Sequence, residues 1–380
     1  MRCSKRPSNG RWAHRLSARG RRPQRPSHRR WRRPRPADRF PSRRRAAQGT
    51  GIRALSAATL CFLRLGDLGE FELIARIERA ARRAGSPRFV VLGIGDDAAI
   101  LRLRSGEDLV VTTDSLVEDV HFRWRSQSAR TIGRRALVAN LSDLAAMGAR
   151  PLGFTLALVT PASLEVATLD GLVAGLLREA RRHGCPLVGG NVSRGTECSL
   201  TITALGAVRR GRALTRRGVR RGDRLFVTGT VGGPALELAR AERGLGQIRR
   251  VPQPRLEAGR ALTRVKQIGG CIDISDGLDA DLDHLLETTR LAAEVAAERI
   301  PLPRGFRAAC RKLGLEPERL ARTGGEDYEL LFSVRPAGPG AGALARRLGV
   351  AVTEIGRLRA AAAVQESRPG PAPHGGFRHF

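Results

Sequence analysis

Acidic side chains gather in this sequence where short apolar segments end. Asp96 and Asp97 follow VVLGIG, Asp114 closes DLVVTTD, and Asp273 closes GCID. Asp143 lies inside the otherwise apolar stretch NLSDLAAMG. Taken singly, each aspartate has an ordinary explanation, because Asp is favoured at helix N-caps and in turns. Taken together, they predict that several carboxylates meet in the folded protein.

Carboxylates that meet in a fold need a compensating positive charge. Two of them about 4 Å apart repel each other by roughly 4 kcal/mol at an effective dielectric constant of 20. The neighbouring residues Thr112, Thr113 and Ser275 offer further oxygen ligands, and no cluster of His and Cys accompanies them. Such a ligand set favours a hard cation, and Mg²⁺ is the usual choice. Because Mg²⁺ held by aspartates generally also binds phosphate oxygens, the pattern indicates a nucleotide.

The lysine-containing phosphate loop of many nucleotide-binding proteins is missing. GxxxxGK followed by Ser or Thr occurs nowhere in the sequence. Glycine-rich turns occur in VGGN (188–191) and TGTVGGP (228–234), and each alone is a weak signal. The residues therefore point to a phosphate site that relies on metal ions instead of a lysine loop.

Helices and strands alternate along the chain and would position these residues. Apolar residues at helical spacing predict helices at 69–85, 131–148 and 163–183. Apolar runs predict strands at 89–95, 108–114, 153–160, 185–191 and 199–208. An arginine- and glycine-rich linker follows at 208–223, and after it come strand–turn–helix patterns at 224–239 and 270–289 and strands within 324–334 and 349–358. This alternation predicts an α/β (α+β) protein of two domains.

The charge of the chain is distributed unevenly. The formal net charge is +32, and residues 1–50 hold 18 basic side chains against one acid, Asp38. This segment has few aliphatic residues and several prolines, so we expect residues 1–65 to be disordered. Three interpretations stay open: translated sequence upstream of the true start, a solvated tail, or an arm that binds nucleic acid.

Two classes of protein are excluded by the remaining composition. No run of 18 apolar residues occurs, which argues against a membrane span. The six cysteines are scattered without a CxxC pair, which argues against a disulfide framework or a zinc site. We therefore expect a cytoplasmic protein.

Eight motifs together resemble one enzyme family. They are GIGDDAA, TTDSLVEDVHF, NLSDLAAMGA, GGNVSRG, GRALTRRG, GDRLFVTGT, IDISDGL and TGGEDYEL, in the order typical of thiamine-monophosphate kinase. The resemblance runs from about Gly69 to the C-terminal GGFRHF. It implies a two-domain PurM-like architecture, of the group that resembles aminoimidazole-ribonucleotide synthetase. The N-terminal domain (66–207) would contain a mixed sheet and form a homodimer, and residues 208–380 would form a C-terminal α/β domain.

The resemblance also implies a reaction and its residues. The family moves the γ-phosphoryl group of ATP onto thiamine monophosphate, so ATP, thiamine monophosphate and several Mg²⁺ ions are the implied ligands. The implied metal ligands are Asp97, Thr112, Thr113, Asp114, Asp143, Asn191, Asp273 and Asp276, with Asp114, Asp143 and Asp273 as the catalytic core. ATP contacts match Gly190, Arg216 and Ser275, and substrate contacts match His121, Glu326 and Phe377.

Two positions depart from the family pattern. Asn191 stands where aspartate is frequent, which removes one negative charge from a metal site. Phe377 stands where Trp or Tyr is common, which keeps an aromatic ring but removes a hydrogen-bond donor. One alternative is another ATP-using enzyme of the same group, although a hydrogenase-maturation relative would end in cysteine and this chain ends in Phe380. A nucleic-acid-binding protein that uses the basic arm is the alternative from a different class, and it leaves the acidic motifs unexplained.

Overall fold

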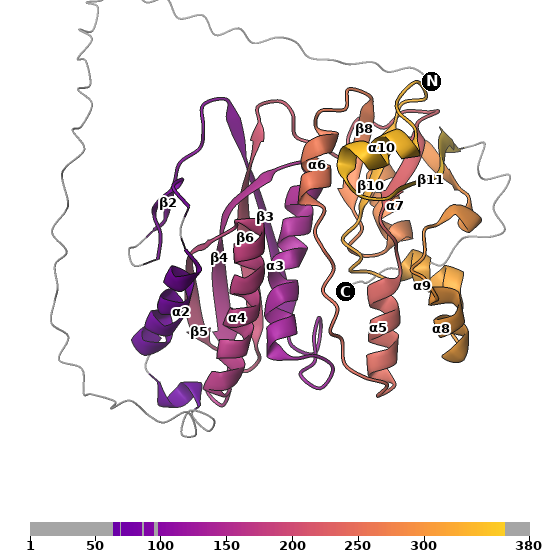
Figure 1. The fold of residues 1–380 in the computed structure, drawn as a ribbon. Coiled ribbons are helices and arrows are strands. Elements are labelled where there is room, and N and C mark those ends of the chain that lie inside the picture. Colours follow the sequence, from indigo (N-terminus) through magenta and orange to yellow (C-terminus); the bar gives the residue numbers. More distant parts are fainter. Residues whose placement is uncertain (1–63, 69, 86, 95–97, 362–380) are drawn as a thin grey trace, which may run out of the picture. The chain divides into compact units, whose positions relative to one another are not determined.

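The computed structural model describes residues 64–361 except 69, 86 and 95–97 (Figure 1). Nearly all of the arginine-rich segment 1–65 lies outside these ranges, so its predicted disorder and the three interpretations of its role stay predictions. Within the described ranges, no helix is long and apolar enough to cross a membrane.

A mixed four-stranded sheet, in the order β3-β6-β4-β5, forms the core of the first half of the described chain. Its strands are β3 (Glu107–Val117), β4 (Arg150–Thr160), β5 (Leu187–Arg194) and β6 (Ser199–Arg209). β4 and β5 run parallel, and the other neighbours run antiparallel. A separate two-stranded ribbon pairs β1 (Val90–Leu92) with β2 (Ile100–Leu101).

Helices cover one face of this sheet. α3 (Ala129–Ala146) packs on β3 and β6 and lies beside α4 (Val166–His183), as Figure 1 shows. α2 (Glu70–Ala84) packs against α4 and β5. The backbones of α3 and α4 approach closely at Gly133, where a Cβ atom would lie 2.0 Å from the carbonyl oxygen of Leu172.

An antiparallel five-stranded sheet, in the order β8-β10-β7-β11-β9, forms the core of the second half. Its strands are β7 (Arg224–Thr228), β8 (Ile268–Asp273), β9 (Leu291–Val295), β10 (Leu330–Val334) and β11 (Val352–Ala360). The helices are α5 (Gly233–Glu242), α6 (Leu256–Leu262), α7 (Leu278–Leu286), α8 (Phe306–Lys312), α9 (Pro317–Thr323) and α10 (Ala341–Leu348). Two short 3₁₀ turns, η1 (Leu65–Asp67) and η2 (Ala297–Arg299), complete the described elements.

Helix α3 is buried between the two halves. Of its 18 residues, 14 are buried, so polar groups on it lie inside the protein. One side faces its own sheet, and the other contacts α6 and β8 of the second half. The contact with α6 is made by backbone, because a Cβ atom on Gly259 would lie 1.9 Å from the carbonyl oxygen of Ala145. The side chains of α3 that face α6 and β8 therefore lie between the two halves.

The predicted α/β class and the order of the main elements are confirmed. The sequence analysis missed the strands β2 and β9 and the short helices α6, α8, α9 and α10. It was wrong about the end of one strand, because β3 continues to Val117 and places Asp114 within the strand. The predicted domain boundary at 207/208 stays a prediction.

Candidate active site

Three aspartates that are far apart in sequence lie together between the halves. On β3, side chains alternate between faces, so Thr112 and Asp114 share the face covered by α3. The Thr112 hydroxyl donates a hydrogen bond to Asp143 Oδ2, and a hydrogen bond between the carboxyl groups of Asp143 and Asp114 raises the pKa of the first and lowers that of the second. Asp273 ends β8, and its Oδ2 accepts a hydrogen bond of 2.6 Å from the hydroxyl of Ser142. The pair Ser142–Asp273 thus links α3 to the second half.

Burial and mutual repulsion favour the protonated forms of these carboxyl groups. Burial, followed by the charges of Asp273 and Asp114, raises the pKa of Asp143 to about 8. Burial raises the pKa of Asp273 to about 6, although the hydrogen bond from Ser142 opposes the shift. The pKa of Asp114 is also raised, by burial first and by the charge of Asp276, against the hydrogen bond from Asp143. Perturbation of this kind is concentrated at functional sites.

The side chains do not form a finished metal shell. Among the described residues, no group of three or more His, Cys, Asp or Glu side chains has the geometry to hold a metal ion. Asp143 and Asp273 instead accept hydrogen bonds from Thr112 and Ser142. Asp276, also expected here, lies close enough for its charge to raise the pKa of Asp114. Asp97 lies outside the described residues.

The loop that follows β8 is fixed by one buried carboxylate. Asp281, on the first turn of α7, is 2% exposed. Its Oδ2 accepts hydrogen bonds from the backbone N–H groups of Ser275, Asp276 and Gly277, at 2.9, 3.0 and 3.2 Å. Since three consecutive amides point at one oxygen, this side chain sets the conformation in which Ser275 and Asp276 are presented.

The segment from Glu326 to Glu329 is backbone-strained. Glu326 and Tyr328 have φ angles of 65° and 51°, in the left-handed region that residues with a Cβ atom rarely adopt. The surrounding contacts hold them there: the Glu326 N–H donates to the carbonyl of Ser275 at 2.7 Å, and the Tyr328 N–H to that of Ile274 at 2.8 Å. Glu326 and Tyr328 are therefore hydrogen-bonded through their backbone to the residues that directly follow β8.

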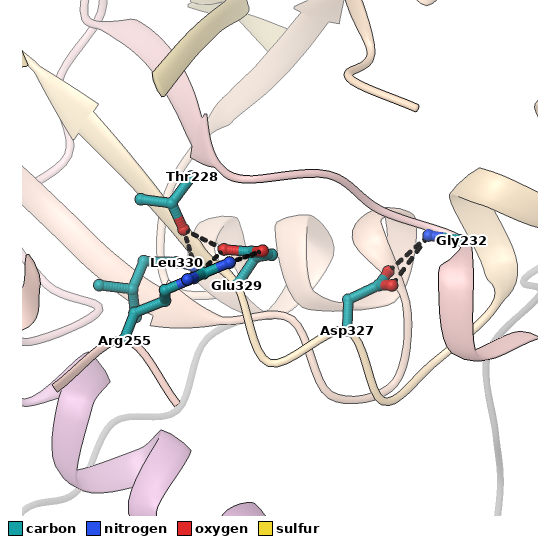
Figure 2. A network of polar contacts seen from close by, with 6 residues as sticks. All are labelled: Thr228, Gly232, Arg255, Asp327, Glu329 and Leu330. Atoms are coloured by element: carbon teal, nitrogen blue, oxygen red, sulfur yellow. Dashed lines mark hydrogen bonds and ion pairs between the residues drawn. The ribbon is translucent and has the colours of Figure 1, made fainter. Parts of the chain in front are cut away.

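Buried acids of the same segment organise the glycine-rich turn after β7 (Figure 2). Asp327 accepts hydrogen bonds from the N–H of Gly232 with both carboxylate oxygens, at 2.8 and 3.0 Å. Glu329 accepts from the hydroxyl of Thr228 at 2.6 Å and from two nitrogens of Arg255. A side chain on Gly229 would collide with this carboxylate, because its Cβ atom would lie 1.9 Å from Glu329 Oε1. The glycine there is required for the close approach.

One functional candidate was missed by the sequence analysis. Arg135, on α3, is 4% exposed and forms an ion pair with Glu326 of the second half. Its guanidinium group also binds the carbonyl oxygen of His121 and the side chain of Gln127. The available signal was an arginine beside the apolar residues Ile132 and Ala136 of a predicted helix. Nothing in the sequence indicated its partners.

His121 and Glu326, the two described residues expected to contact substrate, are thus joined through Arg135. His121 Nδ1 accepts a hydrogen bond from the N–H of Val117 at 3.1 Å. The imidazole lies close enough to Asp114 to lower the pKa of that carboxyl, in opposition to burial. The expected substrate side is therefore continuous with the aspartate cluster. Phe377, the third expected contact, lies outside the described residues.

Other expected site residues do not join the cluster through their side chains. Thr113 lies on the opposite face of β3, where its hydroxyl bonds with that of Thr203 at 2.9 Å. Asn191, on β5, donates to the hydroxyl of Ser193 at 2.8 Å. Gly190 has a φ of 155° and a backbone so close to β4 that a Cβ atom would lie 2.0 Å from a carbonyl oxygen. Arg216 is exposed. The metal and ATP roles expected for these residues stay predictions.

Comparisons with known proteins agree with the motif pattern. A family model described as "AIR synthase related protein, N-terminal domain" matches residues 95–208. Thiamine-monophosphate kinase of Escherichia coli K12 is 37% identical over 331 residues, which is 82% of this chain and 98% of the relative. The enzyme of that name from Mycobacterium tuberculosis H37Rv is 36% identical over 274 residues, covering 70% of this chain and 81% of the relative.

Solved structures of similar proteins have the same fold. Thiamine-monophosphate kinase from Stenotrophomonas maltophilia K279a has a TM-score of 0.67 at 37% identity, covering 77% of this chain and 94% of that one. A structure described as AaThiL complexed with AMPPCP and TMP has a TM-score of 0.57 at 32% identity, with coverages of 78% and 93%. Hydrogenase maturation protein HypE, at 21% identity and a TM-score of 0.62, shares the fold alone. These likenesses confirm the predicted PurM-like architecture.

Proposed function

We propose that this chain, which belongs to the thiamine-monophosphate kinase family, phosphorylates thiamine monophosphate at the expense of ATP, giving thiamine diphosphate and ADP. The observation that carries the proposal is the meeting of Asp114 and Asp143 with Asp273, so that both halves of the chain contribute to the cluster. The relative solved with an ATP analogue and TMP supports both the phosphoryl donor and the acceptor.

The residues present fit Mg²⁺ as the resident cation. Asp114, Asp143 and Asp273 are partly or fully buried oxygen donors. Burial raises the pKa of each, and the charges of Asp273 and Asp114 raise that of Asp143 further, so a divalent cation would stabilise the ionised forms. Hydroxyl oxygens from Thr112 and Ser142 lie against them. We assign Asp97, Asp276 and Asn191 to the same group of several Mg²⁺ ions, and Thr113 through its backbone carbonyl, because its hydroxyl lies on the opposite face of β3. When bound, Mg²⁺ would supply neutralisation of the charge on the two phosphates.

The chain's own residues bind and align the two anions. The attacking oxygen belongs to a phosphate and is already anionic, so no general base is needed to create it. The main opposition to the reaction is repulsion between the two ligands, which positioning and fixed positive charge reduce. In the proposal, Ser275, Gly190 and Arg216 contact ATP, while His121, Glu326 and Phe377 contact thiamine monophosphate. The transfer is direct, and we expect inversion of configuration at the transferred phosphorus.

We also propose a homodimer that forms through the open face of the first sheet. Leu109 and Val111 on β3 are 50% and 55% exposed on the face opposite α3. The same face carries the hydroxyl pair Ser115–Thr201, at 2.7 Å. Exposed apolar residues in a row on a flat sheet favour burial against a second copy. The dimer would be tested by light scattering, and a monomer at all concentrations would contradict it.

A cytoplasmic location is part of the proposal. The described cysteines Cys185, Cys198, Cys271 and Cys310 are free and buried. Free thiols persist most readily in a reducing compartment.

The decisive experiment is a product assay. Purified protein would be incubated with ATP, MgCl₂ and thiamine monophosphate, and thiamine diphosphate would be separated by chromatography. We expect equal amounts of ADP and thiamine diphosphate, and none of the latter without MgCl₂. Hydrolysis of ATP without thiamine diphosphate would favour another ATP-using enzyme of the same architecture. No consumption of ATP under any of these conditions would refute the kinase.

A further inference from the structure

Arg135 makes polar contacts to three separate segments of the chain. Its Nη1 donates to Gln127 Oε1 at 2.5 Å. Its Nη2 donates to the carbonyl oxygen of His121 at 3.4 Å and to Glu326 Oε1. One guanidinium group therefore connects α3, the loop around His121 and the strained segment of the second half.

The environment of Arg135 is unfavourable for a residue with only a packing role. The residue is 4% exposed, and its Nε is buried without a hydrogen-bond partner among the described residues. Burying a guanidinium group is costly, and here burial is outweighed chiefly by the charge of Glu326, so that the pKa of Arg135 is raised. An apolar side chain would pack on α3 without this penalty, as Val138 and Ala139 do on the next turn. The cost of burying Arg135 is explained if the planar, forked guanidinium group is needed at this position on α3.

Arg135 fixes the orientation of the Glu326 carboxylate. Arg135 binds Oε1 of that carboxylate, while the side chain remains 39% exposed. The backbone of Glu326 is fixed in a left-handed conformation with φ of 65°, and its N–H is bound to Ser275. The direction of the carboxylate is therefore set by two independent constraints, and Arg135 supplies the one that acts on the side chain.

We propose that Arg135 is a positioning residue for the phosphate acceptor: it holds Glu326 and the His121 loop in a fixed relation across the two halves. This inference rests on the proposed function, in which both held residues contact thiamine monophosphate. Arg135 acts through these residues and is not itself catalytic. Lysine keeps the charge, but its three N–H donors share one nitrogen, so it cannot hold the carboxylate and the carbonyl in the same planar arrangement.

The test compares Arg135→Lys and Arg135→Gln with wild type by steady-state kinetics for each substrate separately. We expect Arg135→Lys to raise KM for thiamine monophosphate about tenfold and to leave KM for ATP within about twofold. Arg130→Lys is the matched control, because Arg130 lies on the same helix, is exposed and has no side-chain partner among the described residues. It should leave both constants unchanged.

A double-mutant cycle shows whether Arg135 acts through Glu326. In the Glu326→Gln background, Arg135→Lys should raise KM for thiamine monophosphate by less than about threefold, because the partner carboxylate is already altered. Equal increases in both KM values, fully additive effects, or an unchanged KM for thiamine monophosphate would each overturn the proposal. If circular dichroism shows that Arg135→Gln does not fold, the kinetics of Arg135→Lys and the double-mutant cycle still test the proposal. A wild-type protein that makes no thiamine diphosphate would instead refute the proposed function.

Discussion

Replacement of Asp143 by asparagine should have opposite effects on the stability of the fold and on turnover. Asp143 is partly buried beside Asp114 and Asp273, and this burial, followed by their charges, opposes its ionisation. The asparagine side chain would keep the shape of the aspartate and a hydrogen-bonding oxygen while removing the charge. We expect Asp143→Asn to abolish turnover at saturating substrates and, in the metal-free protein at neutral pH, to raise the free energy of unfolding.

The size of the gain follows from the pKa of Asp143. The carboxyl titrates near 3.8 when unperturbed and at about 8 in the folded protein. Between these values the folded state binds more protons than the unfolded state, so the free energy of unfolding falls as the pH rises. One proton corresponds to about 1.4 kcal/mol per pH unit. Between about pH 5.5 and pH 7.5, the advantage of Asp143→Asn over wild type should therefore grow by at most roughly 3 kcal/mol.

The assay is urea denaturation in the presence of a chelator at both pH values, with Asp283→Asn as the control. Asp283 is an exposed aspartate of α7 without a side-chain partner among the described residues, so its variant should follow wild type. Added MgCl₂ should then stabilise wild type far more than Asp143→Asn, because ligands stabilise the state that binds them. An identical pH dependence in the two proteins, or near-normal turnover by Asp143→Asn, would show that the reasoning is wrong.

Three further predictions concern groups that support the site. Asp281→Ala should raise KM for ATP about tenfold or more, because three loop amides lose their acceptor. Asp281→Asn keeps an acceptor oxygen and should raise KM for ATP by a smaller factor. Equal increases in KM for ATP in the two variants would contradict this reasoning. Burial opposes ionisation of Glu179, but His183, whose Nε2 lies 3.5 Å from Oε2, and Arg134, whose Nε donates to Oε1 at 2.6 Å, lower its pKa to about 2. The stability it contributes is therefore complete above about pH 4.5 and lost as the pH falls through about 2, and Glu179→Gln should cost about 1–3 kcal/mol in denaturant titrations at neutral pH. Gly259→Ala should destabilise the folded protein by about 1–3 kcal/mol because of the clash with α3. Gly342→Ala in α10, where only a flexible arginine lies within contact, should stabilise it by about 0.5–1 kcal/mol. A thermal unfolding temperature that is higher for Gly259→Ala than for Gly342→Ala would contradict the packing argument.

Local pattern was sufficient to predict most elements of the fold. Apolar spacing placed the long helices α3 and α4 and the principal strands to within a few residues. The short helices were missed because seven or eight residues rich in Ala, Gly and Arg carry little periodicity, and tertiary contacts decide their conformation. The end of β3 was missed because the acidic and hydroxyl residues from Thr112 to Ser115 resemble a turn, although they lie in a long paired strand.

The candidate site was predictable where one strand or helix supplied the geometry. Alternation along β3 alone would have separated Thr113 from Thr112 and Asp114, and this signal was present in the sequence. The partners of Arg135 and Glu329 could not be predicted in the same way. Arg135 binds a carboxylate 191 positions along the chain, and Glu329 binds a hydroxyl 101 positions before it. Pairing over such separations is fixed by the tertiary fold, and a single sequence does not encode it in any local pattern.

The position of α3 restricts how relatives of this protein could be recombined. A chimera joined in the linker at 208–223 would take α3 from one parent and α6, β8 and the strained segment from the other. The backbone contact at Gly259, the hydrogen bond from Ser142 and the ion pair of Arg135 would then be assembled from unmatched sequences. Chimeras of homologues should therefore fold more often when α3 and the second half come from the same parent than when the junction lies in the linker between the two sheets.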